Sequence, residues 1–255
     1  MKLMKKQSRR RIPTRLAIDI GNSQITMALF HKKHLIRKKQ TTLNTFQKDL
    51  KALIQKQCVD LAAVCSVVPS TTKRAVSMVE KITKAPVKVV QHNLKLSIRT
   101  RRYPKSKLGQ DRLVNIWGAR LFYPKKNVLI VDFGTAITVD FLSRQGVFEG
   151  GMILPGLQMA LDSLHHTTAL LPWVKFKPKP QLLGRDTRSG MQSGIFWGWV
   201  SMISSLVKLH EKKQKGKVLL LLTGGMSPLF APHIQHSYKK LDPAHTLRSL
   251  NAALN

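Results

Sequence analysis

A short pattern that occurs twice is the feature that most constrains the fold of this chain of 255 residues. Residues 16–28 read LAIDIGNSQITMA, and residues 129–141 read LIVDFGTAITVDF. Each copy is an apolar run that enters Asp-x-Gly, passes through a small hydroxyl-bearing segment and leaves in a second run with β-branched residues, which is typical of strand–turn–strand. Asp19 and Asp132 lie 113 residues apart, close to half the chain. The repetition predicts two similar half-domains that each offer one tight turn to a shared crevice.

The two turns have the chemistry of phosphate binding. Gly21 and Gly134 lack a Cβ, so their backbone can bend sharply and its N–H groups can approach an oxyanion. Asp19 and Asp132 would be repelled by bare phosphate, so we expect them to hold a cation, directly or through water. Either copy alone is equally well explained as a β-hairpin with an ordinary glycine turn. Neither copy is a Walker loop or a GxGxxG motif.

The charge of the chain is strongly unbalanced, with 44 Lys and Arg against 12 Asp and Glu and a net charge of +32. Such a field attracts nucleotides, nucleic acids or anionic membranes. The basic residues are spread along the sequence and are not concentrated on one element with aromatic partners, so a generally basic surface is favoured over a nucleic-acid module. Because acids are scarce, it matters that Asp19, Asp111 and Asp132 all fall inside motif-like segments.

Cysteine usage and hydropathy point to a cytoplasmic protein. Cys58 and Cys65 do not make a disulfide framework, and Cys65 lies in an apolar strand-like run where a reduced, buried thiol is expected. Residues 1–14 are a basic extension without the apolar stretch of a signal peptide. Residues 194–207 are uncharged but shorter than the roughly 20 residues that a bilayer requires, so we expect a buried helix and no membrane partner.

Strands and helices are predicted to alternate in each half, which gives an α/β architecture of two stacked half-domains with mixed sheets, spanning 15–124 and 125–255. The expected strands are 16–21, 24–30, 34–41, 61–68, 87–90, 128–133, 136–142, 147–153 and 217–223. The expected helices are 45–57, 71–83, 109–122, a helix after Gly156 to about 166, 187–213 and a last helical stretch. Residues 93–107 and 172–186 are expected to be loops. Ligand sites in such folds lie at strand ends, here between the halves.

Two further segments carry chemistry. Residues 109–112 read Gly-Gln-Asp-Arg and open a helix, where Asp111 is either a routine helix cap or a general base. Arg112 would favour the ionised form of that carboxylate and could bind an anionic group. Residues 223–225 read Thr-Gly-Gly at a strand exit, where the glycines let backbone approach adenine or ribose, unless they form only a strand-to-helix turn. The histidines lack companions at ligand spacing, so metal chemistry by His is not expected.

These segments, in this order, resemble the type III pantothenate kinases of the actin/hexokinase/sugar-kinase superfamily. The family's first phosphate loop is matched at 19–23, its Gly-x-Asp-Arg motif at 109–112 and its second phosphate loop at 132–138. The similarity continues through 150–156, Thr187 and 223–225 and covers nearly the whole chain past residue 15. Ser23 replaces the usual Thr, and Gln110 stands where the family often has a small residue. The basic extension, the charge of +32 and the short C-terminus are not explained by the family.

The resemblance implies ATP-dependent phosphorylation of pantothenate to 4'-phosphopantothenate, the first step of coenzyme A biosynthesis. It implies a fold of duplicated ribonuclease H-like, actin-like ATPase half-domains with an interdomain cleft. It also implies Mg²⁺, a monovalent cation (K⁺ or NH₄⁺), and a homodimer whose pantothenate pocket is completed across an interface that includes residues 195–207.

The family's residue roles transfer as follows. Asp111 is the implied catalytic base. Contacts with ATP are implied for Asp19, Gly21, Asn22, Ser23, Gln24, Thr26, Gly134, Thr135, Gly224 and Gly225. Contacts with pantothenate are implied for Tyr103, Gly109, Gln110, Asp111, Arg112 and Thr187. Asp132 is the implied ligand of the monovalent cation, and Asp19 would bind Mg²⁺ through water.

Two other functions stay open at this point. One is a regulatory or nucleic-acid-binding accessory factor on the same scaffold. The net positive charge favours this function, whereas the presence of Asp19, Asp111 and Asp132 favours an active kinase site. The other is a different enzyme of the superfamily, such as a polyphosphate phosphatase or acetate kinase, whose phosphate loops have other signatures.

Overall fold

The computed structural model describes residues 12–55, 57–178 and 181–255, and its strands form two sheets. Residues 1–11, most of the predicted N-terminal extension, lie outside the described ranges. The first sheet contains β1 (Thr14–Ile20), β2 (Ile25–His31), β3 (His34–Thr41), β4 (Leu61–Ser66) and β5 (Val87–Val89). The second contains β6 (Arg99–Thr100), β7 (Asn127–Phe133), β8 (Ala136–Leu142), β9 (Val147–Pro155), β10 (Val218–Thr223) and β11 (Lys239–Leu241).

The two sheets repeat one topology. The first has the order β3-β2-β1-β4-β5, with β2 antiparallel to both neighbours and β4 parallel to β1 and β5. The second has the order β9-β8-β7-β10-β11 with the same directions, and β6 is added beyond β9. Strand β7 therefore takes the place of β1. This confirms the internal duplication that the repeated Asp-x-Gly pattern predicts.

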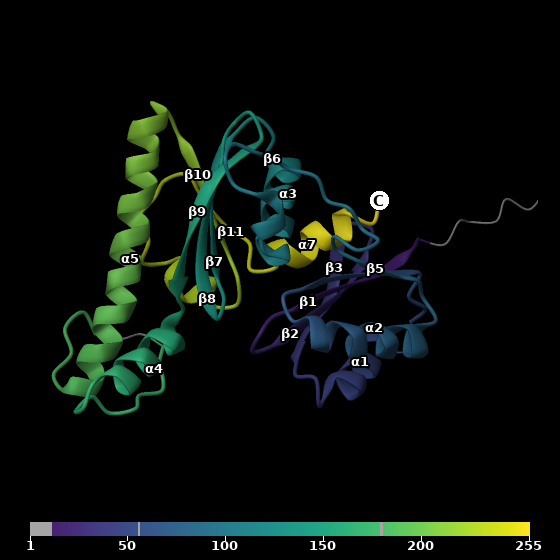
Figure 1. Ribbon diagram of the computed structural model, residues 1–255, viewed down its shortest axis with the longest axis horizontal. Helices are drawn as coiled ribbons and strands as arrows, with labels where there is room; N and C mark the ends of the chain where they lie inside the picture. The colour runs from purple at the N-terminus through teal and green to yellow at the C-terminus, as the bar shows by residue number, and fades with distance from the viewer. Residues whose placement is uncertain (1–11, 56, 179–180) are drawn as a thin grey trace, which may run out of the picture.

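The helices form layers around the sheets. They are α1 (Phe46–Ile54), α2 (Pro69–Thr83), α3 (Gln110–Phe122), α4 (Leu157–Thr167), α5 (Thr187–Gln214), α6 (Ser227–Phe230) and α7 (His245–Ala252), with a 3-10 turn at Lys105–Lys107. Figure 1 shows α1 and α2 covering the first sheet, α3 and α7 between the two sheets, and α5 along the far side of the second sheet. One apolar core joins the inner faces of both sheets to α3 and α7. Separate cores lie under α1 and α2 and under α5.

Strand alternation decides which side chains face the shared core. In β1, Leu16, Ile18 and Ile20 pack toward α1 and α2, whereas Ala17 packs toward α3. Because successive side chains alternate between faces, Asp19 lies on the same inner face as Ala17. The same period in β7 puts Asp132 on the inner face of the second sheet, since Val128 and Ile130 belong to the shared core. The two aspartates thus approach each other from opposite sheets.

Most predicted elements are confirmed, and the exceptions are short. The polar segment expected as loop at 93–107 contains β6, and the last helical stretch contains β11 and two helices. Strand β4 ends at Ser66, because Pro69 opens α2 two residues before the predicted start. Cys65 is fully buried, as predicted. Within the described ranges, none of the helices combines the length and apolarity that a bilayer crossing needs. The division at residue 124 stays a prediction.

Candidate functional site

The two repeated turns touch each other where the sheets meet. The first turn joins β1 to β2 and is closed by a hydrogen bond from the Gly21 N–H to the Gln24 carbonyl, 3.0 Å. The second joins β7 to β8 and is closed by the Gly134 N–H donating to the Ala136 carbonyl, 3.2 Å. The hydroxyl of Thr135 donates to the hydroxyl of Ser23 across 3.0 Å. Asn22, Ser23 and Gln24 are exposed at this junction, and Thr26 is half-buried in register with Asp19.

Asp19 and Asp132 share an environment that disfavours negative charge. The pKa of Asp19 is raised to about 7, mainly by burial and also by the nearby carboxylates of Asp132 and Asp111, while the charge of Lys38 acts in the opposite direction. Burial also raises the pKa of Asp132 to about 6, opposed by a hydrogen bond from Asn115 and assisted by Asp111 and Asp140. Three carboxylates that repel one another at a junction of glycine turns indicate a site that receives a cation or a charged ligand.

Helix α3 presents Asp111 to this junction. Gly109 precedes the helix, and a Cβ at Gly109 would lie 2.7 Å from an oxygen of Asp111. The carboxylate of Asp111 accepts from the backbone N–H of Arg112 at 2.8 Å, so it is also a helix-start acceptor. It is only half-buried and therefore accessible. One turn further along α3, Asn115 donates its amide to Asp132 at 2.8 Å and accepts from the Thr246 hydroxyl of α7 at 2.8 Å.

The guanidinium of Arg112 pairs with Asp140 on β8. Its Nη2 lies 2.5 Å from the Asp140 carboxylate, and both side chains are buried. The hydroxyl of Tyr103 accepts from Arg112 Nη1 at 3.3 Å, and the guanidinium lies 5.5 Å from the Tyr103 ring centre. Burial lowers the pKa of Arg112, but the hydrogen bond and charge of Asp140 outweigh it and raise the pKa. The sequence predicts that Arg112 supports the charge of Asp111. In the structure, the guanidinium of Arg112 is paired with the carboxylate of Asp140 instead.

The Thr-Gly-Gly segment lies directly beside Asp132. Strand β10 pairs with β7 so that Thr223 is opposite Asp132. Gly224 has a positive φ of 88°, and a Cβ there would lie 2.3 Å from the Asp132 carboxylate. Gly225 has more room, since the nearest atom to its added Cβ is Gln40 Nε2 at 3.6 Å. Gly224 is therefore required for the strand exit to pass Asp132.

Thr187 is not near the other predicted site residues in this chain. It is the first residue of α5. Helix α5 packs on the outer face of the second sheet through Phe196, Val200 and Ile203, whereas α3 packs on the inner face. The structure brings together the two turns, the start of α3, Tyr103 and the β10 exit.

Three residues of the site are absent from the motif-based prediction. Asp140 lies on β8, the strand that follows the second turn, and its carboxylate forms the ion pair with Arg112. Asn115 orients Asp132 through a hydrogen bond, and the charge of Lys38 on β3 lowers the pKa of Asp19. The alternation of side chains along a strand could have found Lys38, because Lys38 pairs with Ala28, whose side chain lies on the inner face. The helical spacing of Asn115 from Asp111 is the corresponding signal on α3.

The residues of the site suit a cation whose ligands are mostly water and phosphate oxygens, with few from the protein. Among the described residues there is no cluster of three His, Cys, Asp or Glu side chains suited to a metal, which argues against an all-protein metal cage. Mg²⁺ in phosphate sites is typically held by one or two carboxylates with water and substrate oxygens. The buried hydroxyl of Thr223 has no hydrogen-bond partner and lies opposite Asp132, so these two side chains could contribute oxygen ligands to a monovalent cation.

Comparison with known proteins identifies the family. The family model of the type III pantothenate kinases matches residues 15–209. The chain belongs to the type III pantothenate kinases. The type III pantothenate kinase of Chlorobaculum tepidum is 33% identical over 238 residues, with 88% of this chain and 87% of that protein covered. The one of Chlorobaculum parvum is 32% identical over 264 residues, covering 97% and 98%.

Solved structures support the fold of this pantothenate kinase family member. A crystal structure of a conserved putative Baf family transcriptional activator from Campylobacter jejuni superposes with a TM-score of 0.60 at 17% identity, covering 94% of this chain and 96% of that one. A putative 2-dehydro-3-deoxygalactonokinase from Sinorhizobium meliloti superposes with a TM-score of 0.51 at 14% identity, covering 94% and 95%. At these identities the likeness shows the fold alone, which is the duplicated actin-like fold with two mixed sheets.

Proposed function

We propose that this protein transfers the γ-phosphoryl group of ATP to pantothenate, giving 4'-phosphopantothenate in the first step of coenzyme A biosynthesis. Membership of the type III pantothenate kinases supports this reaction. The structural observation that carries it is the 3.0 Å contact between the hydroxyls of Ser23 and Thr135. That contact puts two glycine turns, from sequence segments far apart, beside one another at the start of α3. A triphosphate tail can then be held from both sides.

The turns would bind ATP. The first turn would contact the phosphates through Gly21, Asn22, Ser23 and Gln24, with Asp19 and Thr26 behind them. The second would contribute Gly134 and Thr135, and the β10 exit would place Gly224 and Gly225 beside the nucleoside. Phosphoryl transfer depends mainly on positioning and on stabilising charge, and backbone N–H groups at such turns serve both purposes.

Asp111 would act as the general base. Its half-buried carboxylate takes the proton of the pantothenate hydroxyl as that oxygen forms a bond to the γ-phosphorus. The bond between the γ-phosphorus and the bridging oxygen breaks, and ADP leaves. A positioned base of this kind contributes about 10²–10⁴-fold to rate. When bound, Mg²⁺ and a monovalent cation would neutralise phosphate charge, with Asp19 and Asp132 as the residues that hold them.

Pantothenate would lie between the start of α3 and a partner subunit. Gly109, Gln110 and Tyr103 line the α3 side, and Arg112 is held there by Asp140. Thr187 begins α5, which packs on the face of the second sheet opposite to α3, and this arrangement favours a contact of Thr187 with pantothenate bound in another subunit. We therefore propose a homodimer in which each subunit supplies Thr187 to the other. The proposal includes a cytoplasmic location, where ATP is available.

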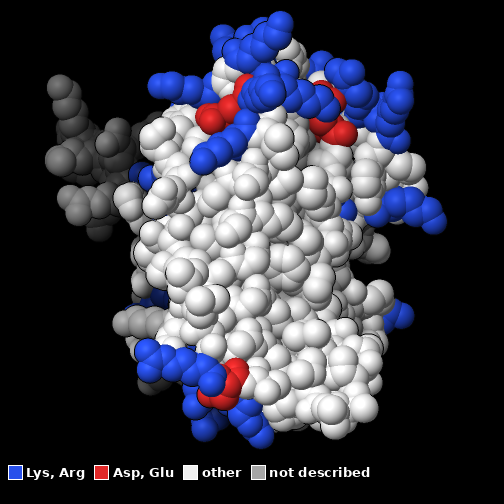
Figure 2. Space-filling model, turned by 90° about the vertical axis from the view of Figure 1, so that its left-hand side faces the viewer, with Lys and Arg blue, Asp and Glu red and all other residues white. Residues whose placement is uncertain are grey.

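The face that carries α5 suits such an interface. Figure 2 shows that this side of the molecule is almost free of charged side chains between basic rims at its two ends, although the chain carries +32. Exposed apolar side chains of the α4–α5 side include Met152, Met159, Leu170 and Trp173. In α5, Gly190, Gly194 and Gly198 would each meet no atom within 4 Å if they carried a Cβ. A partner backbone can approach closely along such a stripe.

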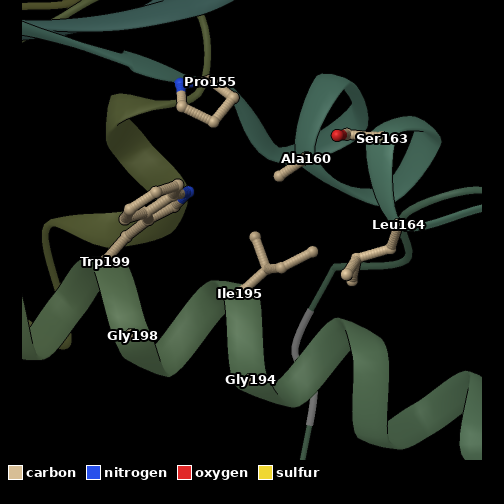
Figure 3. A pocket seen from close by; sticks show the side chains of 8 residues that line it. All are labelled: Pro155, Ala160, Ser163, Leu164, Gly194, Ile195, Gly198 and Trp199. Atoms are coloured by element: carbon tan, nitrogen blue, oxygen red, sulfur yellow. The ribbon is translucent and has the colours of Figure 1, made fainter. Parts of the chain in front are cut away.

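An apolar hollow lies on the same face. Figure 3 shows it between α4 and α5, with Ile195 of α5 directed toward Ala160 and Leu164 of α4 and the ring of Trp199 beneath Pro155. Its volume is about 340 Å³. We propose that an apolar side chain of the partner fills this hollow in the dimer.

The deciding experiment is an ADP-release assay with Mg-ATP, with and without pantothenate, in the presence and absence of K⁺. We expect ADP release only with pantothenate, faster with K⁺, and 4'-phosphopantothenate in the product. ADP release that does not depend on pantothenate would contradict the proposal. The alternative of a nucleic-acid-binding accessory factor is not favoured, because the three aspartates of the kinase motifs are retained at one junction.

A further inference from the structure

We propose that a second site, at the opposite end of the second sheet from the kinase site, binds an anion with several consecutive phosphate groups. The cavity there has a volume of about 640 Å³. Its lining combines five cationic side chains with amides and one aromatic ring. The lining residues are Lys125, Lys126, Asn127, Arg144, Gln145, Gln214, Lys215, Gly216, Lys217 and Tyr238.

The cavity is separated from the kinase site by the length of the sheet. Asn127 is the first residue of β7, and Lys217 directly precedes β10. Asp132 and Thr223 lie near the other ends of these two strands. A strand of seven residues spans about 23 Å, so a ligand in the cavity does not reach the repeated turns. Arg144 and Gln145 join the cavity from the turn between β8 and β9.

The positive charge in this cavity is uncompensated. None of the residues that line it is an acid. Over the described part of the chain, no ion pair involves Lys125, Lys126, Arg144, Lys215 or Lys217. Glu211, on the adjoining turn of α5, is directed to β10, where it accepts from the Val218 N–H at 3.2 Å. Five cations that surround one hollow repel one another, and a multiply charged anion would relieve that repulsion.

The backbone brings these cations together through unusual turns. Lys125 has a φ of 59° and Lys215 a φ of 49°, both in the left-handed region that residues with a Cβ adopt uncommonly. Lys215 ends α5, where its N–H donates to the Lys212 carbonyl. The turn of Arg144 is fixed by its own N–H, which donates to the Asn127 side chain at 2.8 Å. Three separate turns therefore converge on the hollow.

The chemistry of the lining selects an oligophosphate over a nucleic-acid strand. Proteins that bind single-stranded nucleic acid without sequence preference use several aromatic rings on which the bases stack. Here the one ring is Tyr238, and the ammonium of Lys126 already lies 5.2 Å from its centre. Lysine and arginine side chains with amide donors match phosphate oxygens. The ligand is thus a chain of phosphates, either free inorganic oligophosphate or the tail of a nucleotide.

The test is a calorimetric titration of the full chain with inorganic tripolyphosphate, together with hydrogen-exchange mass spectrometry to locate the protected backbone. Arg144→Gln combined with Lys215→Gln removes two exposed cations from the cavity. Lys73→Gln combined with Arg74→Gln is the matched control, since it removes the same charge from the exposed side of α2. Parallel titrations with orthophosphate and with ATP distinguish a single phosphate and a nucleotide tail from free oligophosphate.

We expect tripolyphosphate to protect residues 123–128, 143–147 and 214–218, and orthophosphate to bind at least about tenfold more weakly. The cavity variant should lose at least about tenfold in affinity, whereas the control keeps the wild-type value and both retain kinase turnover. Protection by ATP at the same segments would identify a nucleotide tail as a source, and its absence would identify free oligophosphate. The proposal is overturned if these segments are not protected, if both variants weaken equally, or if only a single-stranded oligonucleotide protects them.

Discussion

Arg112 and Asp140 form a buried ion pair that ties the start of α3 to the second sheet, with Nη2 of the guanidinium 2.5 Å from the carboxylate. Gly151 makes room for it, because a Cβ at that position would lie 2.6 Å from the same guanidinium nitrogen and would also overlap the Asp140 carboxylate. The pair positions the helix turn that carries Asp111, so loss of Asp140 affects both folding and turnover.

Asp140→Ala should lower the free energy of unfolding by about 3–5 kcal/mol, because it leaves the buried guanidinium of Arg112 without a counter-charge. Urea denaturation measures the change. The double variant Arg112→Met with Asp140→Leu should recover most of this stability, since two apolar side chains replace the pair, but not the kinase activity. A loss below about 1 kcal/mol in the single variant would contradict the assigned role.

Gly224→Ala should strongly impair both stability and nucleotide binding. The added methyl group would meet the Asp132 carboxylate at 2.3 Å, and the positive φ of 88° is itself strained for alanine. Gly225→Ala is the control, because its methyl group meets only Gln40 at an ordinary 3.6 Å. Thermal melting with and without Mg-ATP compares the two variants. Equal effects of the two substitutions would show that Asp132 does not constrain this turn.

Asp111→Asn should lower turnover by about 10²–10⁴-fold and leave ATP affinity largely unchanged. The asparagine keeps the size of the side chain and can still accept from the Arg112 N–H, but it cannot take a proton. Steady-state kinetics and nucleotide titration separate the two effects. Near-normal turnover would remove Asp111 as the base.

Mixing two inactive variants tests the shared pantothenate pocket. Asp111→Asn and Thr187→Arg should each be inactive alone. If Thr187 serves the partner, a heterodimer of the two has one intact site, and random reassembly should restore about a quarter of wild-type activity. If Thr187 serves its own subunit, every site carries one lesion and no activity returns. Co-expression with two affinity tags isolates the heterodimer for this assay.

His245 predicts a specific loss of stability at acid pH. Burial lowers its pKa below the ordinary value of 6.5, although its hydrogen bond with the Asn115 carbonyl and the charge of Asp242 oppose the shift. As the pH falls through 6.5, His245 takes up a proton in the unfolded chain but stays neutral in the folded chain. The contribution of His245 to the free energy of unfolding is therefore fully present above pH 6.5 and is lost as the pH falls below that value. Each unit of pH should cost at most about 1.4 kcal/mol.

The control for this prediction is His245→Gln, which cannot titrate. Its free energy of unfolding should be lower than that of wild type at pH 7.5, and the difference should shrink as the pH falls to 5.5. Other titrating groups, including Asp19 and Asp132, are present in both proteins and cancel in the comparison. A difference that stays constant with pH would show that His245 binds a proton equally in both states.

The sequence carries much of the fold and site because the informative signals are local. The Asp-x-Gly repeat and strand alternation predict the duplicated sheets and put Asp19 and Asp132 on facing surfaces. Helical spacing of apolar residues predicts α3, and the uncharged run at 194–207 predicts a buried helix within α5. The partner of Arg112 could not be predicted in this way, because Asp140 is 28 residues away and only the pairing of α3 with β8 brings them together. The short strands β6 and β11 also escape prediction, since two or three residues show no alternation.

The packing of α3 against α7 has a consequence for how the chain folds. Both helices contribute to one core that the inner faces of the two sheets share. A fragment that ended after α3 would leave the apolar side of that helix in water, so the first half of the chain depends on the second half to cover it. The present chain accordingly should melt in a single cooperative transition, despite its two-part ancestry.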